Sequence, residues 1–129
     1  MEKQNRTETD SRIKKGNFGE LLVAHQLEKR GYKIIRQNYR QKFGEVDLIA
    51  QNKNIISFIE VKFRQKEYFN LSEVITSSKQ KKIILAAKNF IAKSGFVDKV
   101  YRFDVALITN ENEVYKIRYI RNAFTESRF

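Results

Sequence analysis

The segment "GEVDLIAQNKNIISFIEVKF", residues 44–63, decides the fold. Apolar and polar residues alternate on both sides of the polar "QNKN", which predicts two strands joined by a turn into an antiparallel hairpin. Three ionisable residues, Asp47, Glu60 and Lys62, stand where the interior of such a hairpin would favour apolar side chains. Their position suggests a role other than folding.

Strand geometry predicts that these three side chains meet. Side chains alternate between the two faces of a strand, so Glu60 and Lys62 share one face. A turn of two or four residues places Asp47 on that same face, either opposite Glu60 or one diagonal away. A three-residue turn would place Asp47 on the other face. Because "QNKN" fits an even-length turn better, we expect the three side chains to converge.

The length and composition indicate a single soluble domain. The chain has 129 residues, of which 41% are hydrophobic and 32% charged, and it contains no cysteine for disulfides or thiolate metal sites. No apolar run approaches the ~20 residues that a membrane span needs. The first residues, "MEKQNRTETDSR", lack the apolar segment of a signal peptide. We therefore expect a cytoplasmic protein.

The charge favours a polyanionic partner. Lys and Arg number 26 against 15 acidic residues, a net charge of +11. Such an excess of positive charge favours binding to nucleic acid or to an acidic membrane surface, although a need for solubility alone also explains it. No basic helix with a broad apolar face is apparent, so nucleic acid is favoured and no membrane partner is expected. The predicted phosphate contacts flank the hairpin and begin the second helix: Arg40, Arg64, Lys79, Lys81 and Lys82.

The rest of the pattern predicts a mixed sheet with helices. Residues 1–12 are expected to be a disordered tail and 13–129 a single domain, with a mobile excursion at 64–76. Gly31 and Gly95 are expected to end the two helices, and Ser77 to cap the second. Helices are expected at 13–30 and 77–94, and strands at 32–40, 43–50, 55–63, 101–109 and 113–120. The order α-β-β-β-α-β-β, with a crossover to a parallel strand, indicates an α/β (α+β) fold.

A fourth ionisable residue, Glu20, lies on or beside the apolar stripe of the first helix. A lone carboxylate there needs compensation by a cation or a lysine. Three carboxylates and one lysine suggest metal-assisted hydrolysis with Mg²⁺ or Mn²⁺, because these ions prefer oxygen ligands and polarise phosphoryl groups. Asp47 and Glu60 are the expected metal ligands, Glu20 a second-metal or water-held ligand, and Lys62 an electrostatic or base-assisting group.

Structural explanations compete for several of these residues. A carboxylate on a half-exposed strand is usually solvated, and the spacing Glu-x-Lys alone is common by chance. Glu45 shares the face but fits a structural role equally well. His25 is expected at the surface, and Asp104 in "RFDV" is expected to pair with Arg102 or a neighbour.

Seven blocks in order resemble the bacterial YraN-like family of uncharacterised predicted endonucleases. They are "GNFGE…A…L…GY" (16–32), "NYR" (38–40), "GEVDLIA" (44–50), "FIEVKFR" (58–64), "VITSSKQ" (74–80), "RFDV" (102–105) and "IRNAF" (120–124). The resemblance implies a restriction-endonuclease-like fold. It places the superfamily signature D-x(n)-[D/E]-x-K (PD-(D/E)XK) on Asp47, Glu60 and Lys62, and its helical glutamate on Glu20.

The family is also similar to archaeal Holliday-junction resolvases, which implies branched or damaged DNA as substrate, with DNA favoured over RNA. Two functions remain open: a Mg²⁺-dependent endonuclease, or a non-catalytic nucleic-acid-binding module that works with a partner nuclease. Retention of all four site residues favours the enzyme. A homodimer is an open alternative to a monomer.

Overall fold

The computed structural model describes residues 8–64 and 70–126, with the side chains of the first helix described from Asn17 onward. Three helices and five strands follow one another along the chain. In order they are α1 (Glu8–Lys29), β1 (Lys33–Gln41), β2 (Gly44–Asn52), β3 (Ile55–Arg64), α2 (Leu71–Val74), α3 (Ser77–Ser94), β4 (Val100–Glu111) and β5 (Val114–Phe124).

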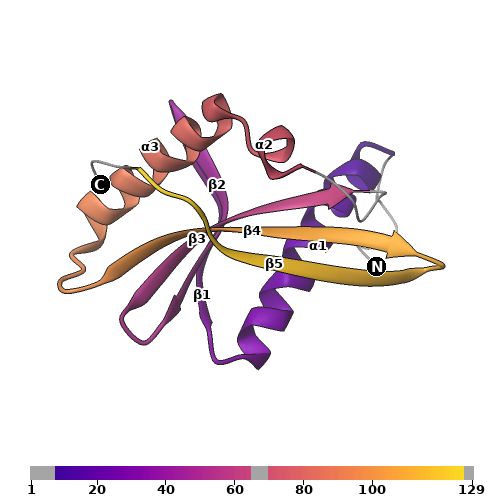
Figure 1. Ribbon diagram of the computed structural model, residues 1–129, viewed down its shortest axis with the longest axis horizontal. Helices are drawn as coiled ribbons and strands as arrows, with labels where there is room; N and C mark the ends of the chain where they lie inside the picture. Colours follow the sequence, from indigo (N-terminus) through magenta and orange to yellow (C-terminus); the bar gives the residue numbers. More distant parts are fainter. Residues whose placement is uncertain (1–7, 65–69, 127–129) are drawn as a thin grey trace.

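The five strands form one mixed sheet in the order β1-β2-β3-β4-β5 (Figure 1). β1, β2 and β3 are an antiparallel meander. α2 and α3 then carry the chain over to β4, which runs parallel to β3, and β5 returns antiparallel to β4. The predicted mixed sheet with one parallel crossover is confirmed.

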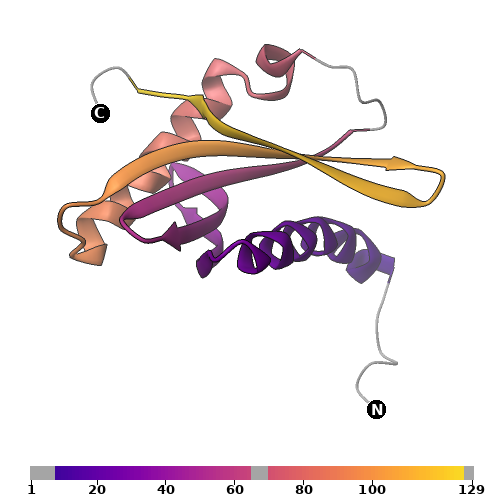
Figure 2. The ribbon, with the colours of Figure 1, turned by 60° about the horizontal axis from the view of Figure 1, so that its bottom comes forward.

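The long helices cover opposite faces of this sheet (Figure 2). α3 packs on Val46, Ile49, Ile56, Phe58 and Phe103 through its own buried side chains. α1 packs on the other face through Val23, Ala24 and Leu27, which meet Leu48, Ala50, Ile59, Ala106 and Ile108. In β3, Phe58 therefore faces α3 and Ile59 faces α1, as strand alternation requires.

The first helix begins earlier than expected, at Glu8 rather than Ile13, so residues 8–12 of the predicted tail are helical. Residues 1–7 lie outside the described residues. The helix ends near Gly31 as predicted, with that glycine at φ +92° and the Tyr32 amide bonded to Leu27 O at 3.0 Å.

The excursion between β3 and α3 contains a short helix, α2, that the sequence pattern did not predict. A single helical turn is too short to show a period, which explains the omission. The cap of α3 is Thr76 rather than the predicted Ser77: the Thr76 hydroxyl accepts from the Lys79 amide at 3.2 Å. Gly95 ends α3 in the left-handed region, as expected. Residues 65–69 of the excursion lie outside the described residues.

A buried ionic network ties β5 to β4. Asp104 is 1% exposed, and its carboxylate accepts three hydrogen bonds from the Arg102 guanidinium, at 2.9 and 3.1 Å from Nε and at 3.0 Å from Nη2. The Tyr119 hydroxyl and the Asn122 amide also donate to it. Arg102 in turn donates to the Tyr32 hydroxyl at 2.8 Å. The predicted pair of Asp104 with Arg102 is confirmed, and all of its contacts are structural.

Asp104→Ala should lower the free energy of unfolding by roughly 3–5 kcal/mol, because it leaves the partly buried Arg102 guanidinium without its counter-ion. Glu28→Ala, which removes an exposed carboxylate from α1, should change it by less than about 0.5 kcal/mol. Denaturant unfolding of both variants measures the difference. Equal stabilities would show that the network contributes nothing.

Candidate active site

The predicted site forms where the β2–β3 hairpin opens. A two-residue connection, Lys53 and Asn54, joins the strands, and the ladder runs from Asn52–Ile55 to Leu48–Ile59. The even-length turn is thus confirmed, and of the two registers that it allowed, the structure has the one with Asp47 opposite Glu60. The next opposing positions are Asp47 and Glu60, but the backbone ladder stops before them.

The Asp47 side chain replaces the missing backbone partner. Its Oδ2 accepts a hydrogen bond from the Val61 amide at 2.8 Å. Beyond this point β3 continues to pair with β4 as far as Arg64, while β2 continues to pair with β1 back to Gly44. The two strands therefore separate with a carboxylate at the fork.

Glu60 is buried beside the fork, at 4% exposure. Two amines contact its Oε2: Lys79 Nζ from α3 at 3.0 Å and Lys62 Nζ from the same strand at 3.6 Å. The structure thus brings Glu60 and Lys62 together as predicted. Lys79, predicted as a phosphate contact, also binds the site carboxylate, a contact that its sequence position gave no reason to expect.

Glu20 reaches the same region from α1. Its Oε1 accepts a hydrogen bond from Asn38 Nδ2 in β1 at 2.9 Å. The preceding Gly19 lets the helix approach β3 closely, since a Cβ there would lie 2.6 Å from the Phe63 ring. Asn38 has a left-handed φ of 51°, which asparagine tolerates better than most residues. Nothing in the sequence pattern indicates this role for Asn38.

Two of the three carboxyl groups, those of Asp47 and Glu20, have raised pKa values. The pKa of Asp47 is raised from 3.8 to about 7, mainly by burial, then by the charge of Glu60 and more weakly by that of Glu20. The carboxyl groups of Asp47 and Glu60 are close enough to share a hydrogen bond. Burial is also the main cause of the raised pKa of Glu20, with Asn38 and Arg40 opposing it. Such mutual repulsion is what a cation would relieve.

The two lysines differ in their proton affinity. Burial, followed by the hydrogen bond with Lys79, lowers the pKa of Lys62. Burial alone would also lower the pKa of Lys79, but its hydrogen bonds and the charge of Glu60 raise it overall. Lys62 is therefore the amine that loses its proton more readily.

Among the described side chains, those of residues 17–64 and 70–126, no group of three or more acidic or histidine residues has the geometry of a metal site. Mg²⁺, however, is usually held by one or two carboxylates, with water and substrate phosphate completing its shell. Asp47 and Glu60 are adjacent, and the charge of Glu60 raises the pKa of Asp47, so this pair fits such a donor set. Glu20 lies close enough to Glu60 for the charge of Glu60 to raise its pKa, but the hydrogen bond from Asn38 orients the Glu20 carboxylate.

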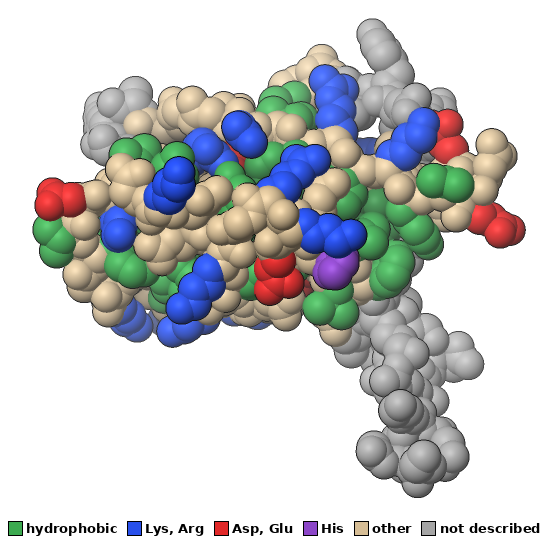
Figure 3. Space-filling model, turned by 90° about the horizontal axis from the view of Figure 1, so that it is seen from below, with side chains coloured by type: hydrophobic (Ala, Val, Ile, Leu, Met, Phe, Trp, Pro, Cys, Tyr) green, Lys and Arg blue, Asp and Glu red, His purple; other side chains and the backbone are tan. Residues whose placement is uncertain are grey.

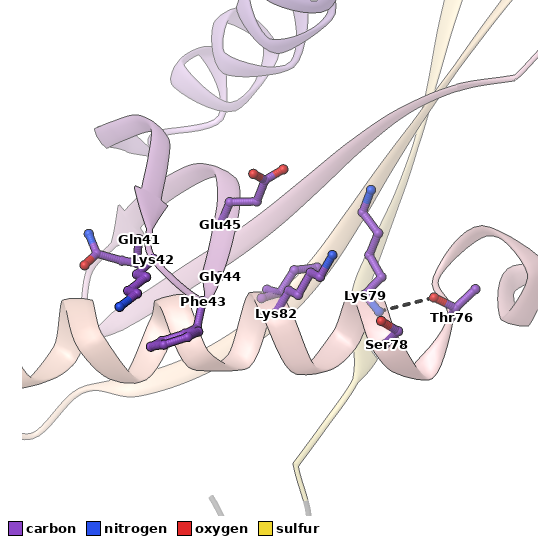
Figure 4. Close-up of a pocket in the computed structure, with 10 residues that line it drawn as sticks. Gln41, Lys42, Phe43, Gly44, Glu45, Thr76, Ser78, Lys79 and Lys82 are labelled. Carbon is purple, nitrogen blue, oxygen red and sulfur yellow. Dashed lines mark hydrogen bonds between the residues drawn. The ribbon is translucent and has the colours of Figure 1, made fainter.

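The remaining predicted phosphate contacts are at least partly accessible to solvent. Arg40 is exposed and lies 3.9 Å from Glu45, Arg64 is half-buried, and Lys81 and Lys82 are exposed on α3. On the α1 side of the molecule, Lys and Arg side chains are spread over the surface (Figure 3). A cavity of about 540 Å³ lies between the β1–β2 turn and the start of α3, with Lys79 and Lys82 in its wall (Figure 4).

Asp47→Asn should stabilise the metal-free protein more at pH about 8 than at pH about 4.5. The fold raises the pKa of Asp47 to about 7, so the parent loses stability as the pH rises from about 4 to about 7, where the unfolded chain has already lost the proton. Asparagine stays neutral and can still accept from Val61.

Denaturant unfolding in EDTA at both pH values measures this effect. The control is Asp98→Asn at an exposed position with left-handed φ, where asparagine is equally tolerated and no pH-dependent gain is expected. An equal gain at both pH values for Asp47→Asn would contradict the raised pKa.

Comparison with known proteins places the chain in a family. Residues 19–108 match the family described as "Uncharacterised protein family UPF0102". A UPF0102 protein of Alkaliphilus metalliredigens is 41% identical over 110 residues, covering 84% of this chain and 96% of the relative. One of Clostridium botulinum strain Loch Maree is 43% identical over 113 residues, covering 84% and 92%.

Among solved structures, Hjc of Archaeoglobus fulgidus, a Holliday junction resolvase, superposes with a TM-score of 0.53. It is 22% identical, and the match covers 79% of this chain and 72% of Hjc, a likeness that shows the fold. No helix among the described residues is long and apolar enough to cross a membrane. The expected resemblance to the YraN-like family is confirmed, and the chain belongs to family UPF0102.

Proposed function

We propose that this protein is a Mg²⁺- or Mn²⁺-dependent endonuclease that hydrolyses phosphodiester bonds in DNA. The observation that carries the proposal is the fork in the hairpin, which sets Asp47 beside buried Glu60 and places Lys62 on Glu60. A site of two adjacent carboxylates and an amine of lowered pKa has little structural value, because it raises the energy of the folded chain.

Asp47 and Glu60 would hold the divalent cation, which supplies Lewis-acid polarisation of the phosphoryl group. Lys62 lies beside Glu60 with a lowered pKa, so it can take a proton from the attacking water as the water oxygen bonds to phosphorus. The bond from phosphorus to one sugar oxygen then breaks, and that oxygen gains a proton. Glu20, oriented by Asn38, would position water at the edge of the site.

The substrate class follows from charge and from the fold. A net charge of +11 on 129 residues suits a polyanion, and salt should weaken its binding as counterions compete for the phosphates. The structural neighbour Hjc is a Holliday junction resolvase, which supports branched DNA as the substrate. We extend the proposal to action in the cytoplasm, and to a homodimer, since a four-way junction offers two equivalent strands to cut.

One observation favours the non-catalytic alternative. Lys79 Nζ lies 3.0 Å from Glu60 Oε2 and neutralises the carboxylate that a cation would need. If this ion pair persists in the presence of Mg²⁺, the chain would bind nucleic acid without cutting it, and a partner nuclease would be needed. Cleavage therefore requires Lys79 to release Glu60.

Glu60→Gln and Lys62→Ala should each reduce cleavage of a four-way DNA junction by at least about 100-fold, because both side chains act on the phosphoryl group in the transition state. Affinity for the same junction, measured in EDTA, should stay close to that of the parent. Gel assays with Mg²⁺ and with Mn²⁺, on junction, flap, nicked and duplex DNA, measure cleavage.

The matched controls are Glu28→Gln and Lys93→Ala, which make the same changes at exposed helix positions and should leave the rate unchanged. A parent protein that binds junctions but cuts none of these substrates with either metal would leave the binding module as the function. Full activity in Glu60→Gln would remove this site from the reaction.

A further inference from the structure

We propose that Phe43, at the tip of the β1–β2 hairpin, stacks on an unpaired nucleobase of the DNA strand that enters the active site. This inference rests on the proposed function and names the feature of DNA that the protein recognises. The relevant surface is the cavity beside α3, which none of the catalytic steps above uses.

The Phe43 side chain is unusually exposed. It is 70% accessible, whereas the large aromatic side chains Phe58 and Phe103 of the same sheet are 0% and 2% accessible. The two-residue turn that carries it, Lys42–Phe43, could be formed by polar residues. The ammonium of Lys42 lies 5.3 Å from the ring centroid, so a cation and an aromatic surface are presented together.

The hairpin tip is held firmly against α3. Gly44 is buried, and a Cβ there would lie 2.1 Å from the backbone oxygen of Lys82 and 3.0 Å from the amide of Ala86. Only a glycine permits this approach of the two backbones. The Phe43 ring therefore projects from a fixed support, and little conformational entropy would be lost when a base stacks on it.

Charge around the cavity suits a nucleic-acid strand. Figure 4 shows Phe43 on the hairpin turn beside α3, with Lys82, Lys79 and the capping residue Thr76 following in that order toward the start of the helix, and Glu45 on the hairpin side. Lys42, Lys79 and Lys82 supply three cations, while Glu45, the single acid of the lining, lies near Arg40 at 3.9 Å. The volume of about 540 Å³ falls within the roughly 300–1,000 Å³ of pockets that enclose small ligands.

Lys79 connects this cavity to the active site. It lines the cavity, and its Nζ reaches Glu60 at 3.0 Å. A strand whose phosphates follow Lys82 and Lys79 would thus pass from the Phe43 ring toward the carboxylates. Inside a duplex both faces of a base are covered by its neighbours, so the ring can accept only an unpaired base, such as one at a bulge, flap or junction.

The test uses the full chain in EDTA, so that it does not depend on cleavage. The probe is a DNA duplex with one unpaired iodouracil nucleotide, and the reference is the same duplex with that base paired to adenine. Light cross-links iodouracil to an aromatic ring stacked on it. We expect a cross-link to Phe43 with the first DNA and none with the second, located by mass spectrometry of peptides.

Phe43→Ala should weaken binding of the unpaired probe on the order of 5- to 100-fold and leave binding of the paired duplex unchanged. Phe43→Tyr should keep both the affinity and the cross-link. The exposure-matched control is Val97→Ala, at a position 72% accessible, and it should change neither.

Equal affinity of the parent and Phe43→Ala for the unpaired probe, or a cross-link elsewhere, would overturn the stacking proposal and leave the proposed nuclease intact. A Phe43 cross-link in a protein that cuts no DNA would support the stacking site and reject the nuclease. Binding to neither DNA would overturn both.

Discussion

The hydrogen bond from the Val61 amide to the Asp47 carboxylate is the contact on which the site depends. It satisfies a strand amide where the neighbouring strand has departed, so β2 and β3 can separate without leaving that donor unpaired. The opening admits Glu20 from the α1 face and Lys79 from the α3 face, although these helices lie on opposite sides of the sheet. A closed hairpin would keep them apart.

The arrangement concentrates unfavourable charge in one place. Asp47, with a pKa of about 7, and buried Glu60 oppose each other, and the ammonium groups of Lys62 and Lys79 partly compensate them. A buried carboxylate elsewhere in the fold is fully hydrogen-bonded: that of Asp104 accepts from the Arg102 guanidinium, the Tyr119 hydroxyl and the Asn122 amide. The Asp104 carboxylate therefore belongs to a structural ionic network, whereas the Asp47 and Glu60 carboxylates form a site suited to binding a ligand.

Much of this could be predicted from the sequence because strand parity is strict. Alternation and an even-length turn were enough to predict that Asp47 and Glu60 lie on one face, opposite each other or one diagonal away. Helical periodicity and the two glycines were enough to predict both long helices. Lys79 and Asn38 could not be placed, since their roles depend on how α3 and β1 approach the fork in three dimensions. The short helix α2 and the early start of α1 carry too little periodicity to be predicted.

The central claim, that the fork formed by Asp47 and Glu60 is a cation site, is tested most directly by a crystal structure of the protein grown with Mn²⁺. We predict an anomalous-difference peak between the Asp47 and Glu60 carboxylates, with the Val61 amide still bonded to Asp47 and the Lys79 ammonium moved away from Glu60. A map with no peak at the fork, and with Lys79 still paired to Glu60, would contradict the account.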